Sequence, residues 1–270
     1  MRAPASLVLI LSAGTALAAT PPFRPSPVPG GVALVSLPGA EPREARFNGE
    51  RVLLWRQGDG WAAVVGIPLS AKPGTAFLNV DGRKVAFTIH PARYPVQRIT
   101  LKNPHQVNPD PEELARIARE QALMAPVWEA WPEGLATDLR FRQPTPGRLT
   151  SSFGLRRIFN GEARAPHSGL DIAAPAGQDV QAPADGTVML TGDFFFSGNT
   201  VLIAHGEGVV SLLCHLQDLA VRQGQRVKAG DLIGHVGMTG RATGPHLHWS
   251  LSLNDARVDP RLFLHGAAAR

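Results

Sequence analysis

The chain has 270 residues, and its 27 Lys and Arg against 22 Asp and Glu give a formal net charge of +5 at pH 7. Hydrophobic residues make up 44% of the sequence and charged residues 18%, which excludes a disordered, low-complexity or fibrous protein. The length allows one large domain or two ordinary ones, and the 28 Gly and 24 Pro favour many turns and short strands over a helical bundle.

Residues 1–18 are predicted to form a secretory signal peptide, because a positive start precedes a short apolar stretch that ends in small residues at Ala18. This stretch is too short and too interrupted to span a bilayer, and no other segment approaches that length. We therefore expect an exported protein without stable membrane insertion. The single cysteine, Cys214, excludes an intramolecular disulfide, so a packed core or a bound metal must supply stability.

Residues 19–105 are predicted to form a β-rich N-terminal domain. Short apolar or alternating runs are separated by Asn-Gly, Asp-Gly and Pro-Gly turn signals. The expected strands cover residues 31–37, 52–55, 61–67, 76–80 and 84–89. This spacing predicts a sandwich-like module. The segment has no cluster of ligand-type residues, which favours a structural or substrate-positioning role.

Residues 106–135 are predicted to form a connecting helix and linker. Asp110 is the expected N-cap, Pro111 the first helical residue, and carboxylates occupy the first turn. Apolar residues then recur at helical spacing as far as Pro126: Leu114, Ile117, Ala118 and Leu123. We expect Trp128 and Trp131 to pack this helix against the rest of the protein.

Residues 136–270 return to a strand-and-turn pattern, so the whole chain is expected to be mainly β. The best strands are predicted at 186–190, 200–204, 209–213, 232–234 and 246–251. Seven of the nine histidines lie after residue 160, and this asymmetry points to chemistry in this segment.

Two spacings among these residues suit a metal site. His167 and Asp171 lie four residues apart in a loop bounded by Pro and Gly, and His246 and His248 share one face of a predicted strand. Catalytic zinc commonly takes three N/O ligands and keeps a fourth position for water. The first pair and one histidine of the second supply three ligands, which leaves the other histidine beside the metal to move protons.

Five motifs, taken together, carry a resemblance to a known family. They are Ser152-Phe-Gly-Leu-Arg156, His167-x3-Asp171, Ala182-x2-Asp185-Gly-Thr-Val188, His215-Leu216 and Gly237-Met-Thr-Gly-Arg-Ala-Thr-Gly-Pro-His-Leu-His248. In order and spacing they resemble the lysostaphin/LytM-type zinc peptidases of family M23, over about residues 148–265. The N-terminal part is similar, less specifically, to the β-rich domain that some Gram-negative members carry.

The resemblance implies a C-terminal groove of antiparallel sheets with one Zn²⁺ on its floor. It makes His167, Asp171 and His248 the zinc ligands, and His215 and His246 the catalytic histidines, without deciding which of the two is the base. It implies hydrolysis of peptide bonds in bacterial peptidoglycan, most plausibly cross-links, by a DD-endopeptidase of the periplasm or cell envelope. A nucleic-acid partner is not expected.

For some residues near these motifs the sequence allows two interpretations. Arg156, Arg157 and Arg164 either contact substrate carboxylates or form a solvated face. Cys214 precedes His215, but neighbours on a strand point to opposite faces, which favours a small buried side chain over a Cys/His dyad. Many relatives have an aromatic residue, usually Tyr, where this chain has Leu213, so the rate or substrate preference is expected to differ.

Three alternatives to an active peptidase remain. A binding module that has lost its ligands is disfavoured, because all three ligands and both catalytic histidines are present. A biotinyl- or lipoyl-type carrier needs an exposed lysine at a hairpin tip, and Lys228 is not in that setting. A latent or weakly active member, which binds the cell wall and regulates other hydrolases with a partner protein, stays open.

Overall fold

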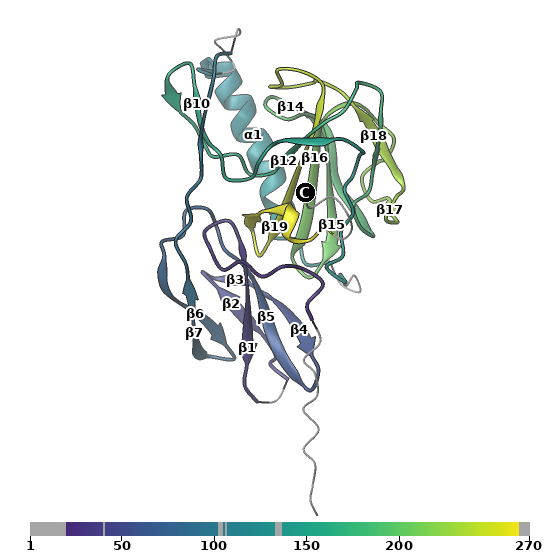
Figure 1. The fold of residues 1–270 in the computed structure, drawn as a ribbon. Coiled ribbons are helices and arrows are strands. Elements are labelled where there is room, and N and C mark those ends of the chain that lie inside the picture. The colour runs from purple at the N-terminus through teal and green to yellow at the C-terminus, as the bar shows by residue number, and fades with distance from the viewer. Residues whose placement is uncertain (1–19, 40, 102–104, 106, 133–136, 265–270) are drawn as a thin grey trace, which may run out of the picture.

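The computed structural model describes residues 20–39, 41–101, 105, 107–132 and 137–264, and the chain forms two β modules with one α-helix beside the second (Figure 1). The expected mainly β, antiparallel architecture is confirmed. The predicted signal peptide lies outside the described residues. Among the described helices, none is long and apolar enough to cross a membrane.

The N-terminal module is a sandwich of two small antiparallel sheets. One sheet has the strand order β1-β5-β4 and the other β3-β2-β6-β7. The strands are β1 (Val32–Leu37), β2 (Ala45–Phe47), β3 (Glu50–Arg51), β4 (Leu53–Gln57), β5 (Gly60–Gly66), β6 (Gly74–Val80) and β7 (Arg83–Ile89). Alternation in β1 and β5 directs Val35 and Val65 into the core between the sheets. The same alternation directs Val32 and Val64 into the core of the second module. The two modules therefore share one packed interface.

Helix α1 (Pro111–Trp128) begins at a capping box, in which the Asp110 carboxylate accepts from the Glu113 backbone N–H and the Glu113 carboxylate accepts from that of Asp110. The helix continues past the expected end at Pro126. Proline removes only one bond from this last turn, and Val127 and Trp128 are buried against the large sheet. Leu114 and Leu123, expected on the apolar face, are instead 53% and 57% exposed.

The C-terminal module is built on a ten-stranded antiparallel sheet. Its strands are β9 (Arg148–Ser151), β12 (Leu170–Ala173), β13 (Asp179–Gln181), β14 (Gly186–Phe194), β15 (Gly198–Gly206), β16 (Val209–Leu219), β17 (Arg226–Val227), β18 (Leu232–Val236), β19 (His246–Leu253) and β20 (Ala256–Val258). A 3₁₀ turn, Pro260–Leu262, follows. All five strands predicted in this segment are present, each at its expected place.

A separate three-stranded sheet joins the segment before α1, whose described residues from 95 to 108 are called the linker from here on, to the C-terminal module. Strand β8 (Val96–Ile99), which the sequence did not predict, pairs in parallel with β10 (Arg156–Phe159), and β10 pairs with β11 (Glu162–Ala163). The Asn160 side chain accepts from the Leu101 backbone N–H and donates to the Leu101 carbonyl. These contacts hold the linker beside the loop that leads to His167.

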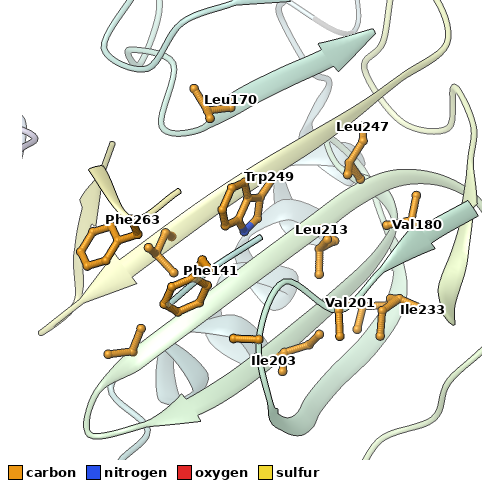
Figure 2. Packing of buried hydrophobic residues seen from close by; sticks show 14 of the residues in the cluster. Phe141, Leu170, Val180, Val201, Ile203, Leu213, Ile233, Leu247, Trp249 and Phe263 are labelled. Atoms are coloured by element: carbon orange, nitrogen blue, oxygen red, sulfur yellow. The ribbon is translucent and has the colours of Figure 1, made fainter. Parts of the chain in front are cut away.

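The large sheet is covered on both faces. Leu247, Trp249 and Leu251 alternate into one core, where Phe141 and Phe263 pack against them (Figure 2). Phe23 stacks on Phe263 at 5.3 Å between ring centroids, so the segment before β1 contributes to this core. On the opposite face, α1 packs on Leu202, Val210, Leu212 and Cys214.

Candidate functional site

Strands β12 and β19 present two of the predicted ligands, Asp171 and His248, on one face of the sheet, and His167 lies in the loop before β12. Asp171 is the cross-strand partner of His248, and Ala173 is the partner of His246. Because side chains alternate along a strand, His246, His248 and Ser250 lie opposite the core residues Leu247 and Trp249. The face that carries them is the one on which α1 packs.

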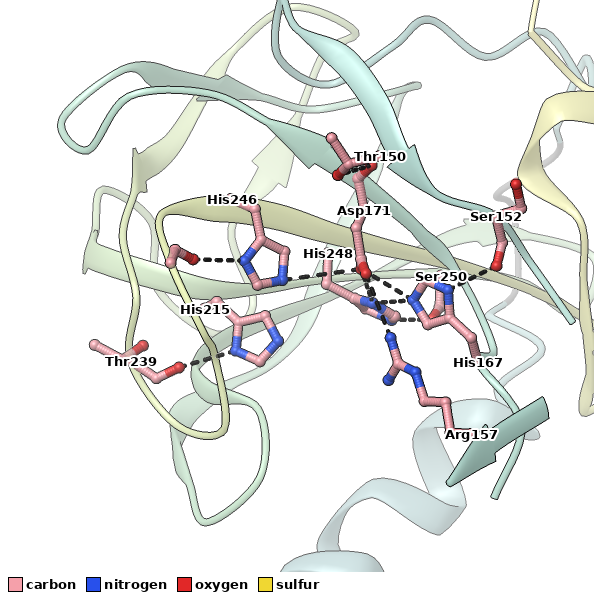
Figure 3. Close-up of polar contacts among 11 residues, drawn as sticks. Thr150, Ser152, Arg157, His167, Asp171, His215, Thr239, His246, His248 and Ser250 are labelled. Carbon is pink, nitrogen blue, oxygen red and sulfur yellow. Dashed lines mark hydrogen bonds and ion pairs between the residues drawn. The ribbon is translucent and has the colours of Figure 1, made fainter. Parts of the chain in front are cut away.

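The three residues predicted to bind a metal converge on one point (Figure 3). His167 Nε2 lies 2.9 Å from Asp171 Oδ1 and 3.0 Å from His248 Nδ1, and His248 Nδ1 lies 2.9 Å from Asp171 Oδ1. His167 is fully buried, and little of the Asp171 and His248 side chains is exposed. The spacing predicted from sequence therefore corresponds to a compact group of ligand atoms.

The remaining ring nitrogens show which atoms face the centre of this group. His167 Nδ1 lies 2.8 Å from the Ser152 carbonyl oxygen, which only accepts, so Nδ1 carries the proton and Nε2 keeps its lone pair. His248 Nε2 lies 2.8 Å from Ser250 Oγ, which can accept its proton and leave the lone pair on Nδ1. Two nitrogen lone pairs and a carboxylate oxygen this close repel one another unless a cation lies between them. This donor set suits a divalent ion such as Zn²⁺.

Gly169 makes the ligand arrangement sterically possible. A Cβ atom at this position would lie 2.5 Å from the Trp249 carbonyl oxygen, 2.7 Å from His248 Nε2 and 2.7 Å from Ser250 Oγ. The loop from His167 to Asp171 can approach β19 this closely only with glycine there.

Burial controls the charge of the ligand residues. Burial alone would raise the pKa of Asp171, but its contacts with His167 and His248 outweigh this effect and hold its pKa well below the ordinary value. Burial lowers the pKa of His248 to about 4, against the opposing influence of Asp171. Asp171 is therefore ionised and His248 neutral near pH 7, as metal ligation requires.

The two predicted catalytic histidines flank the ligand group. Their ring centroids lie 4.8 Å apart, and His246 Nε2 is 3.9 Å from Asp171 Oδ1. His215 Nδ1 donates to the Thr239 carbonyl at 2.9 Å, and His246 Nδ1 donates to the Gly244 carbonyl at 2.8 Å. Because carbonyl oxygens only accept, each neutral ring is left with an unprotonated Nε2.

His215 reaches this position through an irregular backbone. Its φ angle is +63°, in the left-handed region, and the pairing of β16 with β18 shifts register just beyond it. The expectation that Cys214 and His215 point to opposite faces is wrong, since both line one cavity. Cys214 is nevertheless buried, and burial raises its pKa well above the ordinary value, so it is an inert thiol. Burial, followed by the charges of His248 and His246, lowers the pKa of His215 to about 3.

Two cavities open on either side of the ligand group. The first has a volume of about 310 Å³ and reaches the linker and the loop before His246, with Gln97, Ile99, Thr150, Asp171, Pro245 and His246 among its lining residues. The second has a volume of about 340 Å³ and reaches α1, with Met124, Trp128, His167, Leu212, Ser250 and Arg257. Both are lined by Arg157, His215, Arg241 and His248. Because they share these four residues, the two cavities adjoin each other at the ligand group, and they are together called the groove from here on.

The arginines singled out in the sequence lie in different places. Arg156 is exposed on β10 and lines neither cavity. Arg164 donates to the Val107 carbonyl and the Asn108 side chain and pairs with Glu162, so it fastens the linker. Arg157 does reach the groove, and so does Arg241, which lies inside the Gly237–His248 motif but was not singled out, because the motif does not show where its side chain lies.

Other histidines have structural partners. His205 is buried, donates from Nδ1 to the Asp185 carbonyl, and accepts at Nε2 from the Ser211 hydroxyl. His235 pairs with Asp218 and Asp179. Leu213 is buried in the core beside Trp249 and lines neither cavity.

Comparison with known proteins covers both modules. The model described as "Peptidase family M23" matches residues 165–260, and "Peptidase family M23 N-terminal domain" matches residues 25–91. A crystal structure of a putative peptidase M23 from Pseudomonas aeruginosa is 44% identical to this chain, with a TM-score of 0.74, over 88% of this chain and 95% of that one.

Curated relatives match the C-terminal module. The peptidoglycan DD-endopeptidase ShyA of Vibrio cholerae is 41% identical over 121 residues, which are 44% of this chain and 28% of that protein. The DD-carboxypeptidase/endopeptidase Mpg of Neisseria meningitidis is 42% identical over 113 residues, which are 42% of this chain and 26% of that protein. The match thus spans little more than a quarter of the length of these relatives.

Proposed function

This chain belongs to peptidase family M23, and we propose that it is a zinc-dependent endopeptidase that hydrolyses peptide cross-links of bacterial peptidoglycan. The observation that carries the proposal is the convergence of His167 Nε2, Asp171 Oδ1 and His248 Nδ1, with two further histidines beside them. The names of ShyA and Mpg support the substrate class. The predicted signal peptide supports export to the cell envelope, where that polymer lies.

His167, Asp171 and His248 would hold the ion, and the chemistry that Zn²⁺ supplies is polarisation of the scissile carbonyl and a lowered pKa of water. Ser152 and Ser250 orient the two imidazole ligands from behind. His246 and His215 each present an unprotonated Nε2 to the groove, so either can accept from the attacking water, but the low pKa of His215 makes it the weaker base. The ring that takes the proton then becomes a donor to the oxyanion or to the departing amine.

The groove favours cleavage within a chain. It continues on both sides of the ligand group, towards the linker on one side and towards α1 on the other. A substrate can therefore extend past the scissile bond in both directions, as a cross-linked peptide does. This geometry supports a DD-endopeptidase over an enzyme that removes only a terminal residue.

The groove also favours an active protein over a latent cell-wall binding module. Linker residues Gln97 and Ile99 form part of the wall of the first cavity, but they leave both cavities open beside the ligand group. We propose that the linker shapes the groove rather than closing it, so that no regulatory partner is needed to uncover the site.

The test is incubation of residues 19–270 with purified sacculi, followed by separation of the released muropeptides. We expect cross-linked dimers to be cut to monomers, and a chelator or His167→Ala to abolish the cleavage. Metal content measured on the same samples should be one equivalent for the wild type. A metal-loaded chain that releases nothing until a partner protein is added would favour the latent alternative. Release that a chelator and His167→Ala leave unchanged would refute zinc-dependent hydrolysis.

A further inference from the structure

Two neighbouring arginines of β10 lie in different surroundings. Arg156 is exposed and lines neither cavity, whereas Arg157 lines both. Arg157 Nη2 lies 3.3 Å from Asp171 Oδ2. The other oxygen of this carboxylate, Oδ1, lies 2.9 Å from His167 Nε2 and 2.9 Å from His248 Nδ1. Figure 3 shows the guanidinium of Arg157 pointing at this group, so one oxygen of Asp171 faces the ligand nitrogens and the other faces Arg157.

The surroundings of Arg157 do not favour stability. Its side chain is 21% exposed, and its Nε is buried without a hydrogen-bond partner in the described part of the chain. Among the described residues, Asp171 is the single side chain with which its guanidinium forms a hydrogen bond or an ion pair. A buried guanidinium with one charged partner and an unpaired N–H costs free energy relative to an apolar side chain of similar size. A role in holding its partner, a predicted metal ligand, explains the burial better than a contribution to stability does.

The linker helps to fix where Arg157 lies. Strand β10 is not part of the large sheet that carries Asp171. Strand β8 of the linker pairs with β10 in parallel, and Gln97 is the cross-strand partner of Arg157. Just past the end of β10, the Asn160 side chain makes both hydrogen bonds to Leu101. These contacts lie between the two segments that the family models match, so the place of Arg157 beside Asp171 depends on a part of the chain outside both matched domains.

We propose that Arg157 is a positioning residue for Asp171, and that the linker holds Arg157 in place. Ser152 and Ser250 orient the two imidazole ligands, and Arg157 has the corresponding role for the carboxylate. By holding Oδ2, it leaves Oδ1 alone to bind a metal ion and keeps the adjoining position free for water. The inference rests on the part of the proposed function that assigns a divalent ion to this group, and it does not require that peptidoglycan is the substrate.

The test uses Co²⁺ as the probe, since Co²⁺ replaces Zn²⁺ in tetrahedral sites and its visible absorption weakens when a fifth ligand atom binds. In Arg157→Met the freed carboxylate should bind through both oxygens, so the absorption should weaken. On a cross-linked peptide, kcat should fall about 10- to 100-fold with KM little changed. Arg157→Lys, which restores a charge but not the planar group, should recover part of both losses. Arg156→Met is the matched control on the same strand and should keep the wild-type spectrum and kcat.

Asn160→Gly tests the part assigned to the linker, since Asn160 lines neither cavity. It should weaken the Co²⁺ absorption in the same direction as Arg157→Met. The double variant should weaken the absorption no further than Arg157→Met alone, because both changes act through the same side chain. Additive changes, or a wild-type spectrum in Asn160→Gly, would overturn the role of the linker.

A wild-type spectrum in Arg157→Met would overturn the positioning role. A wild-type chain that binds no Co²⁺ would overturn both this inference and the metal site on which it rests. If the wild type and its variants give the expected spectra but cleave no peptide, the proposed function fails and the role of Arg157 stands.

Discussion

The histidines at the groove are oriented by oxygen atoms that lie behind them. Backbone carbonyls of Ser152, Thr239 and Gly244 accept from His167, His215 and His246, and the Ser250 hydroxyl faces His248 Nε2. Sequence spacing predicted which residues would meet. Ser152, Thr239 and Gly244 lie inside the motifs, but nothing in the motifs shows that their carbonyls accept from histidines. The tautomers, and therefore the direction of each lone pair, follow from the tertiary structure.

At the scale of single residues, we expect Gly169→Ala to weaken metal binding by about 10- to 100-fold. The new Cβ would lie within 2.7 Å of both His248 Nε2 and Ser250 Oγ, so the loop and β19 must move apart. Competition with a chromophoric chelator measures the affinity. Gly60→Ala is the control, since its Cβ would meet nothing closer than the Gln57 carbonyl at 3.8 Å. Unchanged affinity in Gly169→Ala would contradict the role assigned to this close approach.

His205 gives a prediction on pH. Burial lowers its pKa to about 4, so the folded protein keeps it neutral while the unfolded chain takes up a proton below about pH 6.5. Since the unfolded state then binds more protons, the free energy of unfolding must rise with pH between about 4 and 6.5. Above about pH 6.5 the full contribution of His205 to the free energy of unfolding is present. About 3 kcal/mol of this contribution is lost when the pH falls to about 4.

Urea unfolding between pH 4.5 and 7, with a chelator present, measures this dependence. His205→Gln cannot take up the proton, so its free energy of unfolding should change less steeply with pH than that of the wild type. Parallel pH profiles would show that His205 does not supply the effect.

At the scale of elements, the strands that follow alternation and turn signals were predictable, and those that depend on distant partners were not. Strand β8 carries no alternating pattern and exists because β10 pairs with it about sixty residues later in the chain. His215 departs from the alternation expected along β16, because its own backbone is in the left-handed region. Helix α1 was recognisable from its N-cap Asp110, its Pro111 and its acidic first turn. Ile117 and Trp128 are buried as predicted, whereas Leu114 and Leu123 are exposed.

The hydrogen bonds that hold Leu101 of the linker beside the end of β10 can be tested by substitution of Asn160. Its side chain makes both hydrogen bonds to Leu101, and its own φ angle is +51°. Asn160→Ala should lower the free energy of unfolding by about 2 to 3 kcal/mol, because the hydrogen bonds are lost and alanine disfavours this backbone conformation. Asn160→Gly loses the hydrogen bonds but tolerates the φ angle, so it should be about 1 kcal/mol less damaging.

Both Asn160 variants should raise KM and expose residues 95–107 to limited proteolysis, since Gln97 and Ile99 form a wall of the first cavity. Wild-type KM and wild-type cleavage patterns in both variants would refute a contribution of the linker to the groove.

At the scale of the whole molecule, the two modules and the segment before β1 form a continuous structure. Asn254 exchanges two hydrogen bonds with the backbone of Gly66 across the interface. Phe23, Leu139 and Phe141 all belong to the core of the C-terminal module, although each precedes β9. A fragment that starts at β9 therefore lacks part of its own core, and its inactivity would say nothing about latency.

Phe23→Ala tests this continuity. Phe23 is 4% exposed and stacks on Phe263, so its truncation should lower the free energy of unfolding by about 3 kcal/mol. Phe77→Ala is the same chemical change at a side chain that is 53% exposed, and it should cost less than about 1 kcal/mol. Thermal unfolding of both variants gives the comparison. Equal effects would mean that the segment before β1 does not complete the core.

The contacts between the segment before β1 and the 3₁₀ turn affect the order in which parts of the chain can fold during synthesis. Arg24 donates from its backbone to the Leu262 carbonyl and from its side chain to the Arg261 carbonyl, across 237 residues in the second case. Contacts between such distant residues carry a high loop-closure entropy and form late in folding. Residues around Phe23 are made long before Phe263 and must wait for it before they can pack. The same delay applies to β19, which carries two of the groove histidines, so the metal-ligand group cannot form before residues 246–253 have been made.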